Sequence, residues 1–261
     1  MTERGGGVGD RKITCLPSDR DFGRLCVVLV ATRNPLNLGA AARAMSNFGF
    51  ARLRVVNPYE VAFREARSAV GAAELLKNAE EYGSVAEAVA DCSLVVGTTA
   101  VRNRELQHRM HALPEGARMI RQRLRSGEVA LLFGSEKTGL SNEALSHCHW
   151  LLRIPTREEH PSMNLGQAAA LCLYEIARSA PRGIRSAKSK GASAGSLERI
   201  TQELLEALRV SGYLKAERSA VSEAKVRRMV RRLGLQAEDA EVLLGMLKQM
   251  LWKMRTSESR S

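Results

Sequence analysis

Residues 25–49 read LCVVLVATRNPLNLGAAARAMSNFG and contain the local pattern that decides the fold. The run Leu25–Ala31 is apolar and rich in valine, which is typical of a strand buried on both faces of a sheet. Thr32–Pro35 interrupts that run, and Asn37 offers a side-chain cap for a helix from about Leu38 to Asn47. The segment therefore predicts a strand, a turn and a helix in immediate succession.

The same alternation of strand and helix patterns continues along the chain. Helical composition marks residues 65–77, 84–91 and 113–125, and an apolar face predicts a closing helix over residues 165–176. Strands that alternate with helices indicate an α/β fold, with a mainly parallel sheet covered by helices on both faces. Ligands of such folds bind in the loops beyond the carboxyl ends of the strands. Short apolar runs predict the remaining strands at Arg52–Val56, Ser93–Gly97, Val129–Phe133 and Trp150–Ile154.

Length and composition divide the 261 residues into parts. Residues 1–23 are predicted to be a flexible basic tail, and residues 24–180 to be the α/β domain. Residues 181–196, PRGIRSAKSKGASAGS, hold four cations and no acid and predict a linker. Apolar periodicity after the linker predicts a small all-helical module over residues 197–256.

The charge balance and the cysteines bound the partners and the location. Lys and Arg number 40 against 28 Asp and Glu, a net charge of +12 that favours nucleic acid or an anionic membrane surface as partner. No apolar run reaches the roughly 18 residues of a membrane span, and residues 1–20 lack the apolar core of a secretory signal. The five cysteines are scattered, which indicates a reducing cytoplasm as the location.

Two short stretches look like common ligand sites but depart from the patterns those sites need. His147, Cys148 and His149 are metal-ligating residue types, yet no second pair of ligands follows them, so no metal site is expected. Residues 133–142, FGSEKTGLSN, contain G-x-x-x-x-G, but Leu140 stands where the nucleotide P-loop needs lysine. What remains is a glycine-bearing turn with one carboxylate, that of Glu136, and taken alone this segment is best explained as a plain turn.

Polar and basic groups supply further candidates. Asn34 and Arg43 flank a helix N-terminus, which attracts phosphate, but a capped helix with a surface arginine explains the same residues. Asn164 fits a helix cap. A basic run predicts either a solvated helix face or an RNA contact; it consists of Lys225, Arg227, Arg228, Arg231 and Arg232.

Three segments in this order resemble a known family. They are NPLNLGAAARAMSNFG (34–49), LLFGSEKTGLSNE (131–143) and LRIPTREEHPSMNLGQAAALCLYEI (152–176). Together they resemble the SpoU branch of the SPOUT RNA 2′-O-methyltransferases, and within it the TrmJ tRNA methyltransferases most closely. The resemblance implies a trefoil knot at the carboxyl end of the α/β domain, S-adenosyl-L-methionine as cofactor and a homodimer. It further implies methylation of a ribose 2′-hydroxyl, on the cytidine or uridine at position 32 of the tRNA anticodon loop.

The resemblance also implies roles for individual residues. Arg43 would clamp a phosphate and stabilise negative charge on the attacking oxygen, with Asn34 and Glu136 orienting it and the substrate. Arg33 and the basic run would contact RNA, and no metal is required. Ser135 stands where many tRNA-modifying relatives have arginine, which affects substrate contacts. The residues expected around the cofactor are Thr98, Thr99, Ala100, Gly134, Ile154, Pro161, Ser162, Met163, Asn164 and Leu165.

The sequence thus supports one principal hypothesis and two alternatives. The principal hypothesis is a cytoplasmic, S-adenosyl-L-methionine-dependent tRNA ribose 2′-O-methyltransferase. The first alternative keeps this chemistry and makes ribosomal RNA the substrate. The second is a non-catalytic RNA-binding protein.

Overall fold

The computed structural model describes residues 20–58, 73–100, 108–178, 191–214 and 219–258. Within these ranges seven strands form one parallel sheet in the order β3-β2-β1-β6-β4-β7-β5. The predicted α/β class with a parallel sheet is therefore confirmed. The strands are β1 (Leu25–Val30), β2 (Arg52–Val56), β3 (Glu80–Tyr82), β4 (Leu94–Thr98), β5 (Met110–Ala112), β6 (Val129–Phe133) and β7 (Trp150–Arg153).

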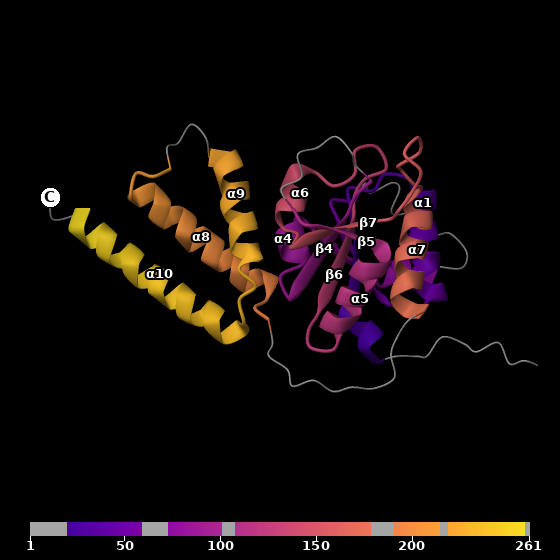
Figure 1. Cartoon of the computed structure of the whole chain (residues 1–261), viewed down its shortest axis with the longest axis horizontal. Helices are drawn as coiled ribbons and strands as arrows, with labels where there is room; N and C mark the ends of the chain where they lie inside the picture. Colours follow the sequence, from indigo (N-terminus) through magenta and orange to yellow (C-terminus); the bar gives the residue numbers. More distant parts are fainter. Residues whose placement is uncertain (1–19, 59–72, 101–107, 179–190, 215–218, 259–261) are drawn as a thin grey trace, which may run out of the picture.

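Helices cover both faces of the sheet (Figure 1). One face is covered by the 3-10 helix η1 (Arg20–Arg24) and by α1 (Pro35–Asn47), α3 (Ala73–Lys77), α5 (Leu113–Leu124) and α7 (Leu165–Arg178). The other face is covered by the short helices α4 (Val85–Ala88) and α6 (Asn142–Ser146).

The central strand β1 shows why its sequence is apolar throughout. Leu25, Val27 and Leu29 point into the core beneath α1, α5 and α7. Cys26 and Val28 alternate with them and point into the core beneath α4 and α6. All five side chains are fully buried, because both faces of the strand are covered.

The structure differs from the predictions at several element boundaries. The edge strands β3 and β5 were not predicted, because each has three residues, partly exposed, without an apolar run. Residues 20–23 belong to η1 rather than to a tail, and Phe22 packs on Phe50 with ring centroids 4.8 Å apart. Residues 1–19 of the predicted tail and residues 65–72 of a predicted helix lie outside the described residues.

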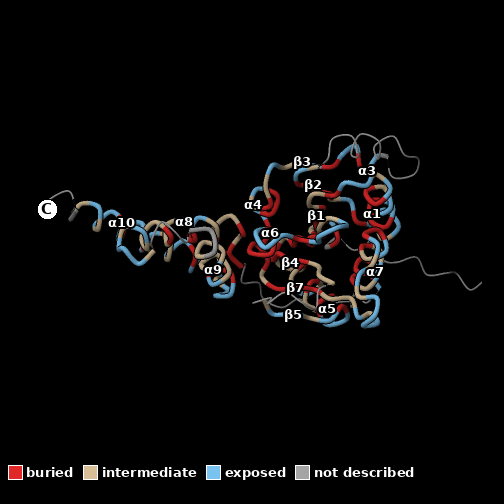
Figure 2. Tube along the Cα trace, turned by 90° about the horizontal axis from the view of Figure 1, so that it is seen from above, coloured by how far each residue is buried: buried red, intermediate tan, exposed pale blue. Residues whose placement is uncertain are grey.

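The carboxyl-terminal part of the described chain is helical and extends to one side of the sheet domain (Figures 1 and 2). We call α8 (Ala194–Val210), α9 (Ser219–Arg232) and α10 (Ala237–Glu258) the helical module. Its own small core includes Leu197, Ile200, Val230 and Leu247. Helix α8 begins inside the predicted linker, of which residues 181–190 lie outside the described ranges.

Backbone hydrogen bonds join the helical module to the sheet domain. The Ala194 amide donates to the Cys92 carbonyl at 2.6 Å, and the Gly195 amide donates to the Ala90 carbonyl at 2.8 Å. A Cβ at position 195 would lie 2.9 Å from the Ala90 oxygen, so glycine permits this close approach. The start of α8 is therefore fixed against the turn before β4. The trefoil knot stays a prediction, because strand order alone does not define a knot.

Candidate active site

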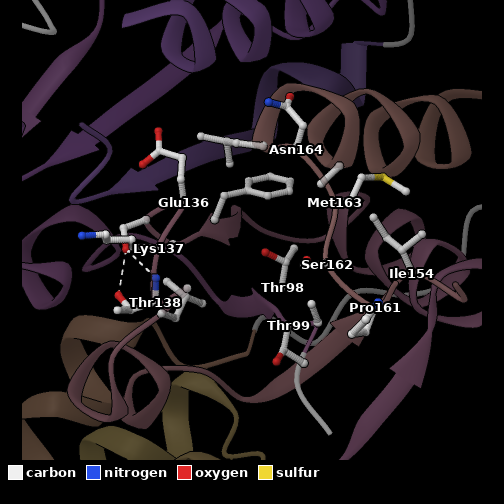
Figure 3. A pocket seen from close by; sticks show the side chains of 18 of the residues that line it. Thr98, Thr99, Glu136, Lys137, Thr138, Ile154, Pro161, Ser162, Met163 and Asn164 are labelled. Carbon is white, nitrogen blue, oxygen red and sulfur yellow. Dashed lines mark hydrogen bonds between the residues drawn. The ribbon is translucent and has the colours of Figure 1, made fainter. Parts of the chain in front are cut away.

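A cavity of about 490 Å³ opens at the carboxyl edge of the sheet (Figure 3). This volume falls within the range of about 300–1,000 Å³ that is usual for small-molecule and cofactor sites. Its walls come from the loops after β4, β6 and β7 and from the first turn of α1. The structure brings together here every residue expected around the cofactor, namely Thr98, Thr99, Ala100, Gly134, Ile154, Pro161, Ser162, Met163, Asn164 and Leu165.

The loop after β4 is held by hydrogen bonds to neighbouring strands. The Thr98 hydroxyl donates to the Leu132 carbonyl of β6 at 2.9 Å. The Thr99 amide donates to the Leu152 carbonyl of β7 at 3.0 Å. Both threonines therefore have fixed positions at the cavity wall.

The loop after β6 crosses itself at Gly134. A Cβ at this position would lie 2.1 Å from the carbonyl carbon of Gly139 and from the amide nitrogen of Leu140. The hydroxyls of Ser135 and Thr138 lie 2.8 Å apart and tie the same turn together. The turn therefore requires glycine at position 134, and its backbone is exposed to the cavity at the crossing.

The loop after β7 ends at Asn164, which lines the cavity and caps α7. Its Oδ1 accepts from the amides of Gly166 at 2.9 Å and Gln167 at 3.3 Å. The sequence-based prediction of a cap is therefore confirmed. Its side-chain Nδ2 donates to Asn37 Oδ1 of α1 at 2.8 Å.

Glu136 is the acidic residue of the cavity and accepts three hydrogen bonds. Its carboxylate accepts from Asn37 Nδ2 at 3.0 Å and from the amides of Asn34 at 3.3 Å and Arg33 at 3.4 Å. Partial burial raises its pKa, but the bonds from the Asn37 side chain and from backbone amides outweigh burial, so the pKa lies below its ordinary value. Glu136 is therefore an ionised carboxylate that holds the turn before α1.

Asn37 is the site residue that the sequence analysis assigned wrongly. It does not cap α1; Asn34 does, by accepting from the Leu36 amide at 2.9 Å. Asn37 instead accepts from Asn164 Nδ2 at 2.8 Å while it donates to Glu136. It is 8% exposed and lines the cavity, and it joins the loops after β6 and β7 to the first turn of α1. Pro35 was the available signal, because proline favours the first helical position and makes the preceding residue the cap.

Arg43 and Asn34 lie near the cavity but not in its wall. The structure places neither among the described residues that line it. Arg43 is exposed on α1, about two helical turns beyond the turn that Glu136 holds. It shares its face of the helix with Leu36, seven residues earlier. Asn34 and Glu136 fix the residue at which α1 starts, and their role in orienting Arg43 stays a prediction.

The basic run on α9 is divided by the fold. Arg231 is 2% exposed, and Arg227 pairs with Glu198 at 3.1 Å, so both face inward. Their predicted contact with RNA is wrong for this docked position of α9, because the side chains contact α6 and α8 instead. Lys225 and Arg232 are exposed, and Arg228 is half-buried.

The histidines near β7 have structural roles. His149 Nδ1 accepts from the Val95 amide at 3.1 Å, and the His147 side chain lies against Arg231. Within the described ranges, no three His, Cys, Asp or Glu side chains gather closely enough to hold a metal ion. None of the helices in those ranges is long and apolar enough to cross a bilayer.

Comparison with solved structures defines the class of protein. The fold matches the crystal structure of TrmJ from Z. mobilis ZM4 with a TM-score of 0.75 and 30% identity, covering 86% of this chain and 98% of that one. The parallel sheet with a loop-lined cavity at its carboxyl edge is therefore the SPOUT architecture that the three motifs implied.

The family follows from the sequence comparisons. The chain belongs to the SpoU rRNA methylase family, whose model matches residues 24–174. The tRNA (cytidine/uridine-2′-O-)-methyltransferase TrmJ of Sodalis glossinidius is 35% identical over 228 residues, which cover 85% of this chain and 89% of that protein. The protein of the same name from Pectobacterium atrosepticum is 31% identical over 230 residues, covering 86% and 95%. The resemblance found in the sequence is confirmed.

Proposed function

We propose that this chain is a tRNA ribose 2′-O-methyltransferase that uses S-adenosyl-L-methionine. The observation that carries the proposal is the cavity, where loops far apart in the sequence converge on one ligand-sized space. Relatives that this chain matches over most of their length are named tRNA (cytidine/uridine-2′-O-)-methyltransferases. The net charge of +12 suits an RNA substrate, whose phosphates dominate such binding.

The walls of the cavity fit S-adenosyl-L-methionine. Apolar side chains of Leu140, Leu152 and Ile154 offer a surface for the adenine, and the close crossing at Gly134 exposes backbone groups beside it. Thr98, Ser162 and Asn164 add hydrogen-bonding groups for the ribose and the amino-acid portion. When bound, the cofactor supplies a methyl group on a positively charged sulfur.

The residues of the chain have to align the ribose oxygen with that methyl group. Glu136, Asn37 and Asn164 form a continuous hydrogen-bonded chain from the loop after β6 to the start of α7. This chain fixes the turn before α1 relative to the cofactor cavity. We assign Glu136 and Asn37 as positioning residues, because the Glu136 carboxylate is already engaged by three donors.

Arg43 supplies positive charge at the reacting oxygen. Arginine is a permanent cation and a poor base, so the proposed role of Arg43 does not include removal of the hydroxyl proton. A planar guanidinium binds a phosphate with two hydrogen bonds, and it stabilises negative charge that develops on the ribose oxygen. Arg33 is exposed in the turn before α1, where its backbone amide donates to Glu136, and it would contact a neighbouring phosphate.

A homodimer is part of the proposal. Leu36 on α1 is 79% exposed, and Leu171 and Tyr174 on the adjacent α7 are 40% and 47% exposed. Helices α1 and α7 pack against each other, and Gly166 of α7 allows close approach to Ala40 of α1. Exposed large apolar side chains on neighbouring helices favour burial against a second copy.

The helical module contributes the second RNA contact. Lys225 and Arg232 present exposed cations on α9, and half-buried Arg228 lies between them in the sequence. With Arg33 in the turn before α1 and Arg43 on that helix, they give an RNA of tRNA size two separate regions of attachment. The proposed target is the cytidine or uridine at position 32 of the anticodon loop, and the proposed location is the cytoplasm.

Methyl transfer from labelled S-adenosyl-L-methionine tests the function. Purified protein is incubated with unmodified tRNA transcripts and, separately, with ribosomal RNA fragments, and mass spectrometry maps the modified nucleotide. The expected product is a 2′-O-methylated pyrimidine at tRNA position 32. Transfer to ribosomal fragments alone would establish the ribosomal alternative. Tight tRNA binding without saturable cofactor binding would establish a non-catalytic RNA-binding protein.

A further inference from the structure

The inward-facing arginines of α9 form a compact group of charges with α8 and α6. Glu198 on α8 receives Arg227 Nε at 3.1 Å and lies 3.5 Å from Arg231 Nη2. We call Glu198, Arg227, Arg231, Ser146 and His147 the docking cluster. Arg231 is 2% exposed, and the Arg227 and Glu198 side chains are 16% and 14% exposed, so water reaches the cluster poorly.

Arg227 connects the helical module directly to α6. Its Nη1 donates to the Ser146 hydroxyl at 3.2 Å, and that hydroxyl donates to the Glu143 carbonyl inside α6 at 2.7 Å. Ser146 is fully buried. Arg231 Nη2 lies 3.4 Å from His147 Nδ1, immediately after the helix. The last turn of α6 is therefore held from the module side.

The other side of α6 belongs to the cofactor cavity. Leu145, the residue before Ser146, lines the cavity, and so does Leu140 just before the Ser141 cap of the helix. Helix α6 is five residues long and directly follows the loop of residues 134–140. A helix this short owes its position to its tertiary contacts. Any shift of its last turn therefore moves the cavity wall.

The charges in the docking cluster do not balance. Two guanidinium groups face one carboxylate. His147 is neutral and does not change this balance, because burial, then Arg231 and Arg227, lower its pKa to about 3. Arg231 Nε and Nη1 are buried and have no hydrogen-bond partner in the described part of the chain. A buried ion group with such unpaired donors is a poor source of stability. A role in fixing one docked position accounts for it better.

We propose that Arg227 is a positioning residue, through which the docked helical module holds α6 and the loop of residues 134–140 in the cofactor-binding conformation. The chain of contacts runs from Glu198 through Arg227 and Ser146 to Leu145. The module therefore sets the affinity of the cavity as well as contacting RNA. The identity of the cavity ligand rests on the proposed function, whereas the position of the loop does not.

Three full-length variants test the positioning role. Arg227→Met keeps the length of the side chain and removes its donors, and Ser146→Ala removes the acceptor but keeps the Arg227–Glu198 pair. Arg209→Met is the matched control, because Arg209 pairs with Glu223 and Glu206 inside the module. Hydrogen–deuterium exchange follows residues 134–146, and calorimetry measures the dissociation constant of S-adenosylhomocysteine.

Arg227→Met and Ser146→Ala are expected to speed exchange in residues 134–146 and to weaken binding by about 3- to 30-fold, whereas Arg209→Met leaves both unchanged. The KM for S-adenosyl-L-methionine rises by a similar factor, while kcat at saturating cofactor stays within about twofold. Cooperative unfolding at the wild-type temperature shows that the variants are folded.

Three results would overturn the proposal. One is unchanged exchange and affinity in folded Arg227→Met and Ser146→Ala. Another is weaker binding without faster exchange in residues 134–146, and the third is an equal effect of Arg209→Met. If the wild-type protein fails to bind S-adenosylhomocysteine, the proposed function fails, and the exchange comparison alone still decides the positioning role.

Discussion

Replacing Asn37 with aspartate turns its hydrogen bond to Glu136 into a contact between two carboxylates. The Asn37 amide donates to Glu136 at 3.0 Å, and the variant would place a second carboxylate at that distance. Two like charges about 3 Å apart repel by about 1.4 kcal/mol in water and about 5.5 kcal/mol at an effective dielectric constant near 20. Because Glu136 is exposed on one side, we expect a loss near the lower limit, about 2 kcal/mol in the free energy of unfolding.

The sign of the pH dependence follows from the shared site. In the wild-type protein the pKa of Glu136 lies below its ordinary value, so its ionised carboxylate stabilises the fold at pH values above that ordinary pKa. This contribution is lost as the pH falls through the pKa of the folded state. In Asn37→Asp the two carboxyl groups titrate as a pair, and one of them has a raised pKa. The variant is therefore destabilised most at about pH 8 and recovers towards about pH 5, where one proton is shared.

Urea unfolding at the two pH values measures the effect, and two further variants separate its causes. Asn37→Ala removes the hydrogen bonds without adding charge and is expected to cost about 1–2 kcal/mol at both pH values. Asn47→Asp, at the exposed end of the same helix, controls for the added charge and is expected to cost less than about 1 kcal/mol. If Asn37→Asp and Asn37→Ala lose the same stability at both pH values, the contact with Glu136 does not exist in solution.

Four other changes test separate parts of the structure. Arg43→Ala is expected to lower kcat by at least about 100-fold and to leave cofactor affinity within about twofold in calorimetry; an equal loss of affinity would make Arg43 structural. Gly134→Ala is expected to abolish cofactor binding, because the added Cβ would lie 2.1 Å from backbone atoms of the same loop; binding at the wild-type level would refute the crossing. Replacing Lys225 and Arg232 with glutamine is expected to make the salt dependence of tRNA binding shallower by about one to two in the log–log slope, as filter binding would show; an unchanged slope would remove α9 from the RNA surface. Burial, then nearby arginines, lower the pKa of His147 to about 3, so below about pH 6.5 only the unfolded chain takes up a proton at this residue, and the free energy of unfolding falls by up to about 1.4 kcal/mol per pH unit. His147→Asn should flatten this slope in urea titrations. An identical slope would contradict the buried neutral ring.

The central strands and the loops that line the cavity could be predicted, because their sequences satisfy strong local rules. The apolar run of β1 has one explanation, burial on both faces, and the ends of parallel strands must meet at one edge. The edge strands β3 and β5 could not be predicted, because three partly exposed residues bury too little to leave a pattern. Their positions depend on pairing with β2 and β7.

Within the site, the sequence mispredicts the roles of residues whose positions depend on tertiary contacts. Asn34 precedes α1 and Asn37 lies in its first turn, and only Pro35 distinguishes the cap from the residue that reaches Glu136. On α9 the apolar side chains of Met229 and Leu233 are 42% and 54% exposed. Arg231 is buried instead and the Arg227 side chain is only 16% exposed, because α6 and α8 provide partners that the helix's own sequence does not reveal.

The joint at the start of α8 bears on how such proteins diverge. The amides of Ala194 and Gly195 donate to carbonyl groups of the sheet domain, so the attachment depends on main-chain atoms and on the absence of a side chain at Gly195. Substitutions of exposed residues on the three helices, outside the docking cluster, leave this anchorage intact. The exposed surface of the helical module can therefore change during evolution to fit new RNA shapes, while the sheet domain stays the same.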